Sequence, residues 1–91
     1  MSEERPFLEY REDDHWIRIF SQYLDDTDMK WHRDEEDRII EAIETTDWLF
    51  QFEDREPISL NQKIFIPKGV LHRGIKGTGD LKIKIKIYKY I

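Results

Sequence analysis

The stretch that decides the fold is Ile64–His72, which reads Ile-Phe-Ile-Pro-Lys-Gly-Val-Leu-His. Its first three residues are apolar and favour a short β-strand. Pro67 fixes φ and cannot donate a backbone hydrogen bond, so it belongs at the end of a strand. Gly69 supplies the backbone freedom that reverses the chain. His72 then begins the returning strand, where its imidazole is a candidate metal ligand because neutral imidazole binds metals so often.

This stretch resembles the second sequence motif of the cupin superfamily, Pro-x-Gly-x-x-His. In that family the His is a metal ligand inside a small β-barrel, so the resemblance implies the same role for His72. The implied fold is mainly β, a small antiparallel β-barrel of the double-stranded β-helix or jelly-roll type. The resemblance covers residues 29–88 of the chain.

The first cupin motif has two His residues one position apart and a Glu a few residues later. The matching segment of this chain is Trp31–Glu44. When the end of this segment is aligned with the end of the family's motif, His32 takes the place of the first His. Asp34 then takes the place of the second His, and Arg38 that of the Glu. The first motif is therefore degenerate, with one His of two.

The sequence does not settle which residue supplies the carboxylate of the predicted site, because a slightly shifted register places Asp37 or Glu36 at the Glu position. Residues i and i+2 of a strand point to the same face, so His32 and Asp34 would lie together. A bulge in the segment would let Asp37 reach them. With His72, these side chains predict a site for one divalent transition metal: Fe, Mn, Zn or Ni. Two imidazoles and one carboxylate form the facial triad of non-haem iron oxygenases.

Three further residues are expected to line the barrel cavity: Arg38, Trp48 and Phe50. A guanidinium group in place of the family's Glu could bind a carboxylate or a phosphate. Aromatic side chains that point inward pack in the core of a barrel, and some of them also line its cavity. Both roles stay open for Trp48 and Phe50.

The segment before the predicted barrel, residues 1–28, is expected to form an arm and a helix, and residues 29–91 the cupin-like barrel. Apolar residues between Trp16 and Leu24 recur at the spacing of an amphipathic helix. Asp13 or Asp14 could cap its N-terminus. Trp16–Phe20 also has the composition of a strand, so that alternative remains open.

After residue 28 the chain has the pattern of short strands joined by tight turns, which is typical of an antiparallel sandwich or small barrel. The last strand alternates apolar residues with lysines, which predicts one buried and one solvated face. We interpret its lysine row as protection of an outer strand against edge pairing, rather than as a nucleic-acid surface. The predicted strands are Met29–His32, Ile39–Glu44, Trp48–Phe52, Pro57–Leu60, Lys63–Ile66, Leu71–Ile75 and Leu81–Tyr88.

The composition narrows the class of protein. The chain has 91 residues, which is one domain with a modest core, so we expect a homodimer. It has no Cys and a net charge of −5, which exclude thiolate chemistry and argue against nucleic acid as a partner. The polar N-terminus and the lack of a long apolar run argue against export and a membrane partner, and we expect a cytoplasmic protein. The sequence contains no Gly-rich phosphate loop, so it does not indicate a nucleotide or another organic cofactor.

Two function classes remain open at this point. The first is a metal-dependent enzyme of oxygenase, isomerase or lyase type that acts on a small polar molecule. The second is a non-catalytic barrel that binds a small ligand or acts as a dimeric assembly module after loss of the metal site. The Pro-x-Gly-x-x-His match favours a metal, and the degenerate first motif favours the second class slightly.

Overall fold

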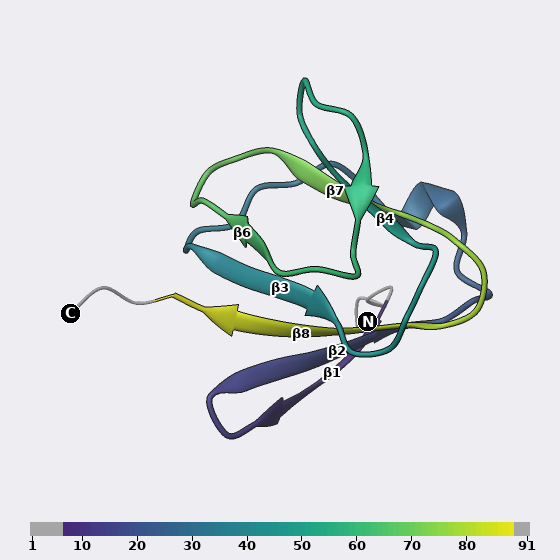
Figure 1. The fold of residues 1–91 in the computed structure, drawn as a ribbon, viewed down its shortest axis with the longest axis horizontal. Helices are drawn as coiled ribbons and strands as arrows, with labels where there is room; N and C mark the ends of the chain where they lie inside the picture. Colours follow the sequence, from purple (N-terminus) through teal and green to yellow (C-terminus); the bar gives the residue numbers. More distant parts are fainter. Residues whose placement is uncertain (1–6, 89–91) are drawn as a thin grey trace, which may run out of the picture.

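The computed structural model describes residues 7–88, which form two antiparallel sheets (Figure 1). The larger sheet has the strand order β1-β2-β8-β3-β6, and the smaller has the order β5-β4-β7. One short 3-10 helix, Asp26–Asp28, follows β2. The strands are β1 (Phe7–Glu12), β2 (His15–Phe20), β3 (Arg38–Ala42), β4 (Leu49–Phe52), β5 (Ile58–Ser59), β6 (Ile64–Ile66), β7 (His72–Ile75) and β8 (Leu81–Ile87).

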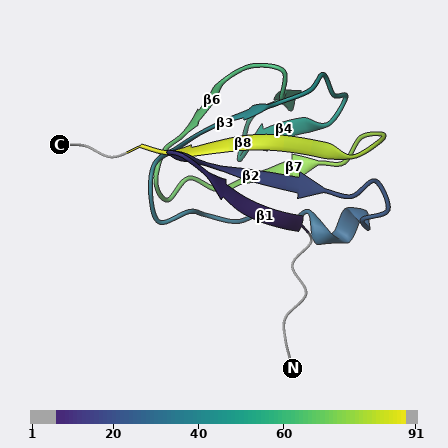
Figure 2. The ribbon, with the colours of Figure 1, turned by 90° about the horizontal axis from the view of Figure 1, so that it is seen from below.

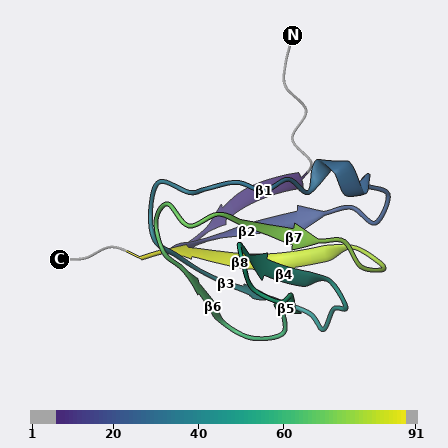
Figure 3. The same cartoon turned by 90° about the horizontal axis from the view of Figure 1, so that it is seen from above.

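The two sheets lie face to face and enclose the core. Figure 2 shows the larger sheet from one side of the molecule, and Figure 3 shows the smaller sheet from the opposite side. The mainly β, barrel-like fold predicted from the sequence is confirmed. No helix among residues 7–88 is long and apolar enough to cross a membrane. The buried core residues are Phe20, Ile40, Trp48, Phe50, Leu60, Ile64, Ile66, Leu81, Ile83 and Ile85.

The strand β8 has the alternation that its sequence predicts, but it does not lie at an edge. Leu81, Ile83 and Ile85 are buried, and β8 is paired with β2 on one side and with β3 on the other. The interpretation of the lysine row as edge protection is therefore wrong. Lys82 and Lys86 instead project to the outer face, where they form ion pairs with Glu44 and Asp14. Exposed pairs of this kind contribute little to stability.

The N-terminal helix predicted for residues 16–24 is wrong, and the strand alternative is confirmed. Residues 15–20 form β2, which pairs with β1 and β8 in the larger sheet. Glu12 pairs with His15, so Asp13 and Asp14 form the hairpin turn instead of a helix cap. Asp13 has a φ of 44°, a left-handed conformation that Asp tolerates better than most residues.

The turn between β6 and β7 forms as the sequence predicts. The backbone N–H of Val70 donates to the carbonyl oxygen of Pro67 at 3.2 Å, and Gly69 has a φ of 80°. The chain therefore returns across the barrel and places His72 at the first position of β7. The strand predicted at 29–32 is not formed, since only His32 makes an isolated bridge there.

Candidate metal centre

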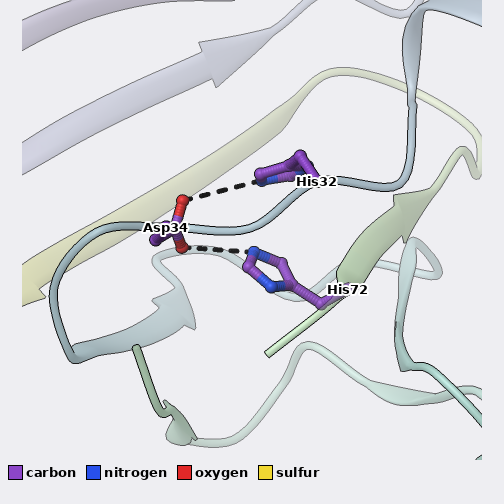
Figure 4. Close-up of side chains that lie close together, drawn as sticks. All are labelled: His32, Asp34 and His72. Atoms are coloured by element: carbon purple, nitrogen blue, oxygen red, sulfur yellow. Dashed lines mark ion pairs between the residues drawn. The ribbon is translucent and has the colours of Figure 1, made fainter. Parts of the chain in front are cut away.

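Three side chains with metal-binding atoms lie close together: those of Asp34 and His72, which are largely buried, and that of His32, which is 50% exposed (Figure 4). One ligand atom from each lies within 4.8 Å of the others. His32 and Asp34 come from the segment before β3, and His72 comes from β7. The side chains of His32 and Asp34 lie close together, with 3.9 Å between Nε2 and Oδ1, although Asp34 lies outside any strand.

The two histidines are tied together through their backbones. The N–H of His32 donates to the carbonyl oxygen of His72 at 2.9 Å, and the N–H of His72 donates back to His32 at 3.0 Å. The centroids of the two imidazole rings are 4.3 Å apart. This reciprocal bridge fixes the spacing of the rings without any help from a bound ion.

Each imidazole also has its orientation set by a backbone carbonyl two residues earlier. Nδ1 of His32 lies 2.9 Å from the oxygen of Lys30, and Nδ1 of His72 lies 2.8 Å from the oxygen of Val70. A carbonyl oxygen can only accept, so each Nδ1 carries the hydrogen. In the neutral ring, Nε2 is then left with its lone pair. Histidines that bind metals commonly donate their second ring N–H to a carbonyl in this way.

Both Nε2 atoms face the carboxylate of Asp34, whose side chain is 7% exposed. Nε2 of His72 lies 3.2 Å from Oδ2, and Nε2 of His32 lies 3.9 Å from Oδ1. Oδ2 is buried and has no well-aligned hydrogen bond. Two nitrogen lone pairs and an orphaned carboxylate oxygen therefore converge. A cation between them would satisfy all three, so the donor set fits a metal ion.

The carboxylate of Asp34 is ionised at neutral pH. Burial alone would raise its pKa, but the imidazole of His72 and the positive charge of Arg38, 3.5 Å from Oδ1, outweigh burial. They hold the pKa of Asp34 below its ordinary value of 3.8. A site that needs a charged oxygen ligand therefore has one already in the metal-free fold.

A cavity of about 360 Å³ adjoins the three side chains. Arg38 and Phe50 are among the residues that line it. The ring of Phe50 stacks on the imidazole of His72, with 5.5 Å between their centroids. Trp48 is absent from the lining formed by residues 7–88. It is completely buried, and its Nε1–H donates to the carbonyl oxygens of Thr78 and Gly79.

The alternative carboxylates of the sequence reading point elsewhere. Asp37 lies outside the group of possible ligands formed within residues 7–88, and its Oδ1 accepts from the backbone N–H of Lys68 at 2.7 Å. Oε1 of Glu36 pairs with Nη2 of Arg38 at 2.6 Å. Of the open choices, the structure therefore brings Asp34 to the histidines.

The cavity lining also includes residues that were not expected from the sequence, among them Arg18. Its guanidinium group pairs with Glu9 at 2.6 Å and lies over the ring of Phe7 at 3.9 Å. A helical assignment of this segment concealed it. Strand alternation would have placed Arg18 on the same face as Phe20, which is buried in the core.

Comparisons with known proteins concern the fold that carries this site. Neither a family model nor a curated protein sequence matches the chain. One similar solved structure, titled for the DMSP lyases RdDddP and RnDddQII, has a TM-score of 0.69 and 16% identity. The match covers 82% of this chain and 37% of that one, so this chain spans well under half of its length.

Two smaller structures match over almost their whole length. A cupin domain from Bordetella pertussis has a TM-score of 0.56 and 16% identity, covering 97% of this chain and 100% of its own. A protein from Shewanella frigidimarina that contains a cupin-2 domain has a TM-score of 0.56 and 19% identity, covering 99% and 85%. At these identities the likeness concerns the fold. The chain has the cupin fold, with a His-His-Asp group that could hold a metal beside its cavity.

Proposed function

We propose that this chain is a metal-dependent barrel protein in which His32, Asp34 and His72 hold one divalent transition metal beside a ligand cavity. One observation carries the proposal. Two imidazoles whose Nδ1–H groups are already bonded turn their Nε2 atoms toward a buried carboxylate oxygen that lacks a hydrogen bond. Leaving such an oxygen unsatisfied costs about 1–3 kcal/mol, so a site of this kind is expected to have a bound partner.

The ligand set suits reactive rather than structural metal binding. Three protein ligands leave coordination positions open, whereas structural sites are closed by four. Nitrogen and oxygen donors without sulfur suit Fe, Mn, Zn or Ni. A metal bound here would act as a Lewis acid toward an oxygen atom of a ligand in the cavity. Oxygenase, isomerase or lyase chemistry on a small molecule is the class of activity that we propose.

The protein's own side chains prepare the site for this role. The carbonyl oxygens of Lys30 and Val70 keep both imidazoles in one orientation. Nη1 of Arg38 lies 3.5 Å from Oδ1 of Asp34 and helps to hold the carboxylate in place. Phe50 covers one face of His72 and keeps water from that side of the ring. A site held in this way loses little entropy when a metal and a ligand bind.

The test is the metal content of tag-free protein purified without chelator, measured by inductively coupled plasma mass spectrometry. We expect about one transition metal ion per chain in the wild type and none in His72→Ala, because the two remaining protein ligands are too few to hold the ion. His15→Ala is the matched control, since His15 pairs with Asp14 and Glu12 on the hairpin, outside the site. Equal metal content in all three proteins, or no uptake by the wild type after reloading, would contradict the proposal.

Metal binding and catalysis are separated by a second measurement. A wild type that binds metal but turns over no substrate in a screen of small acids and sugars would point to the non-catalytic, ligand-binding class. A failed screen would agree with the mostly apolar lining of the cavity, which suits ligand binding without catalysis.

A further inference from the structure

Two arginines contribute to the lining of a cavity that is otherwise mostly apolar. Arg18 lies in the middle of β2 and Arg38 opens β3, and both line the cavity. Each occupies a strand position whose neighbours on the same face, Phe20 and Ile40, are core residues. Charged side chains are seldom placed at such positions, because removal from water is costly without a partner. Both arginines are therefore expected to have charged partners.

Each guanidinium group is held in place by a glutamate. Nε and Nη2 of Arg18 lie 2.8 and 2.6 Å from the same oxygen of Glu9. Nε and Nη2 of Arg38 lie 2.9 and 2.6 Å from the same oxygen of Glu36. Burial lowers the pKa of Arg18 and the charge of Arg38 acts in the same direction, while the carboxylates of Glu9 and Asp34 raise it. The two guanidinium groups therefore affect each other electrostatically, and nearby carboxylates stabilise their charged forms.

The charge balance of the site depends on the metal. Arg18 and Arg38 contribute two positive charges, while Glu9, Glu36 and Asp34 contribute three negative charges, which leaves −1. A divalent ion changes the balance to +1. In a cavity of low polarity, one uncompensated positive charge favours a ligand with a single negative charge. The other charged residues of the lining cancel each other: Asp28 and Lys30.

The rest of the cavity suits a short hydrocarbon body. Its volume of about 360 Å³ corresponds to about a dozen water molecules at ~30 Å³ each. That is enough for a small molecule. The apolar part of the lining includes Phe20, Met29, Phe50, Leu60, Leu81 and Ile83.

We infer that the ligand of this cavity is a small monocarboxylate with an apolar body, whose carboxylate is bound by Arg18 and Arg38. This inference rests on the proposed function, because the site becomes net positive only with a metal. Guanidinium groups are well suited to carboxylates, whose two oxygens match their planar array of N–H donors. A neutral alcohol or a cationic amine of the same length lacks this match.

The experiment is isothermal titration calorimetry of zinc-loaded protein with hexanoate, hexan-1-ol and hexylammonium. Zinc is chosen because it is redox-inert, so binding is measured without turnover. We expect hexanoate to bind at least tenfold more tightly than the other two, and only to the loaded protein. Arg18→Gln and Arg38→Gln should each lower the affinity for hexanoate by about ten- to a hundredfold, which is the effect of losing a hydrogen bond to a charged group.

The matched control is Arg73→Gln, the same chemical change on β7. Arg73 bonds to Gln51 and lies over Trp31, and it does not belong to the cavity lining formed by residues 7–88. The affinity of the Arg73→Gln variant for hexanoate should stay within twofold of that of the wild type. Arg18→Lys, which keeps the charge, should recover part of the affinity and shows that the position tolerates exchange.

Zinc content measured on the same samples separates the two claims. The carboxylate inference would be overturned if the protein binds one zinc but binds hexan-1-ol or hexylammonium more tightly than hexanoate. It would also be overturned if neither Arg18→Gln nor Arg38→Gln changes the affinity for hexanoate. In both cases the metal site would stand. Protein that binds no zinc would overturn both. Tight, zinc-dependent hexanoate binding that is lost in Arg18→Gln and kept in Arg73→Gln supports the inference.

Discussion

Replacing Trp48 with Phe separates the two roles that the sequence left open for this side chain. The indole is completely buried, its ring centroid is 6.1 Å from that of Phe20, and its Nε1–H lies 3.3 and 3.1 Å from the oxygens of Thr78 and Gly79. The structure therefore makes Trp48 an anchor for the loop that leads into β8. A phenyl ring would keep the aromatic contact and lose the donor.

The expected cost follows from these contacts. The exchange removes on the order of 50 Å² of buried apolar surface, about 1 kcal/mol at ~25 cal/mol/Å². Loss of the donor for buried carbonyl oxygens adds about 1–2 kcal/mol. We expect the free energy of unfolding to fall by about 2–3 kcal/mol, and Tm by about 10–20 °C for a domain of this size. Zinc affinity should not change.

The assay is urea unfolding followed by far-ultraviolet circular dichroism, because loss of a tryptophan alters the fluorescence signal. Trp31→Phe is the control, since Trp31 is 40% exposed and its exchange should cost less than about 0.5 kcal/mol. The anchor role would be refuted if Trp48→Phe left the unfolding free energy within 0.5 kcal/mol of the wild type. A tenfold loss of zinc affinity at unchanged stability would instead support a role for Trp48 in lining the cavity.

Three further outcomes are expected. Zinc at a hundredfold excess over its Kd should raise the unfolding free energy by about 2.7 kcal/mol in the wild type and not in Asp34→Asn; an equal thermal shift in both would remove Asp34 from the site. Gly77→Ala would bring a Cβ atom to 2.7 Å from the backbone nitrogen of Trp48 and should cost about 1–3 kcal/mol, and an unchanged urea midpoint would show that the loop can yield. A hydrogen bond from His15 is the main cause that lowers the pKa of Asp14 from 3.8 to about 2. This stabilisation is present above pH 3.8 and is lost as the pH falls toward 2, so Asp14→Asn should flatten the pH dependence of Tm in that window; parallel profiles would count against it.

The parts of the fold that were predictable are those with a local signal. The alternation of Leu81–Ile87 places one face in the core, and a register slip would expose that whole face, so the pattern is decisive. The turn at Pro67 and Gly69 follows from the backbone properties of those two residues. The neighbours of β8 carried no local signal, because strand order depends on pairing between distant segments. The edge interpretation of its lysines failed for that reason.

The helix error has a specific physical cause. The strand β2 is apolar on both faces: Phe20 is in the core, and Ile17, on the outer face opposite Tyr10 and Lys84, is only 4% exposed. A strand that is covered on both faces loses its alternation, and its apolar residues then also fit helical spacing. The β-branched and aromatic composition was the better guide, and pairing with β8 settles the outcome.

The candidate site was predictable in part for similar reasons. The spacing of His32 and Asp34 and the turn before His72 are local features, and the structure brings these three side chains together. The choice between Asp34 and Asp37 depended on a contact from Asp37 to the backbone of a residue 31 positions away. No local pattern reports such a contact. Arg18 was hidden by the helix assignment alone.

The central position of β8 has a consequence for how the chain folds. Its two neighbours, β2 and β3, precede it by many residues, so the larger sheet can be completed only after residues 81–87 have been synthesised. Until then, the inner faces of β2 and β3 lack the strand that joins them. Such non-local pairing makes folding slow and leaves apolar surface exposed meanwhile. Until β8 pairs with it, the β1–β2 hairpin lacks the neighbouring strand that joins it to β3 and β6.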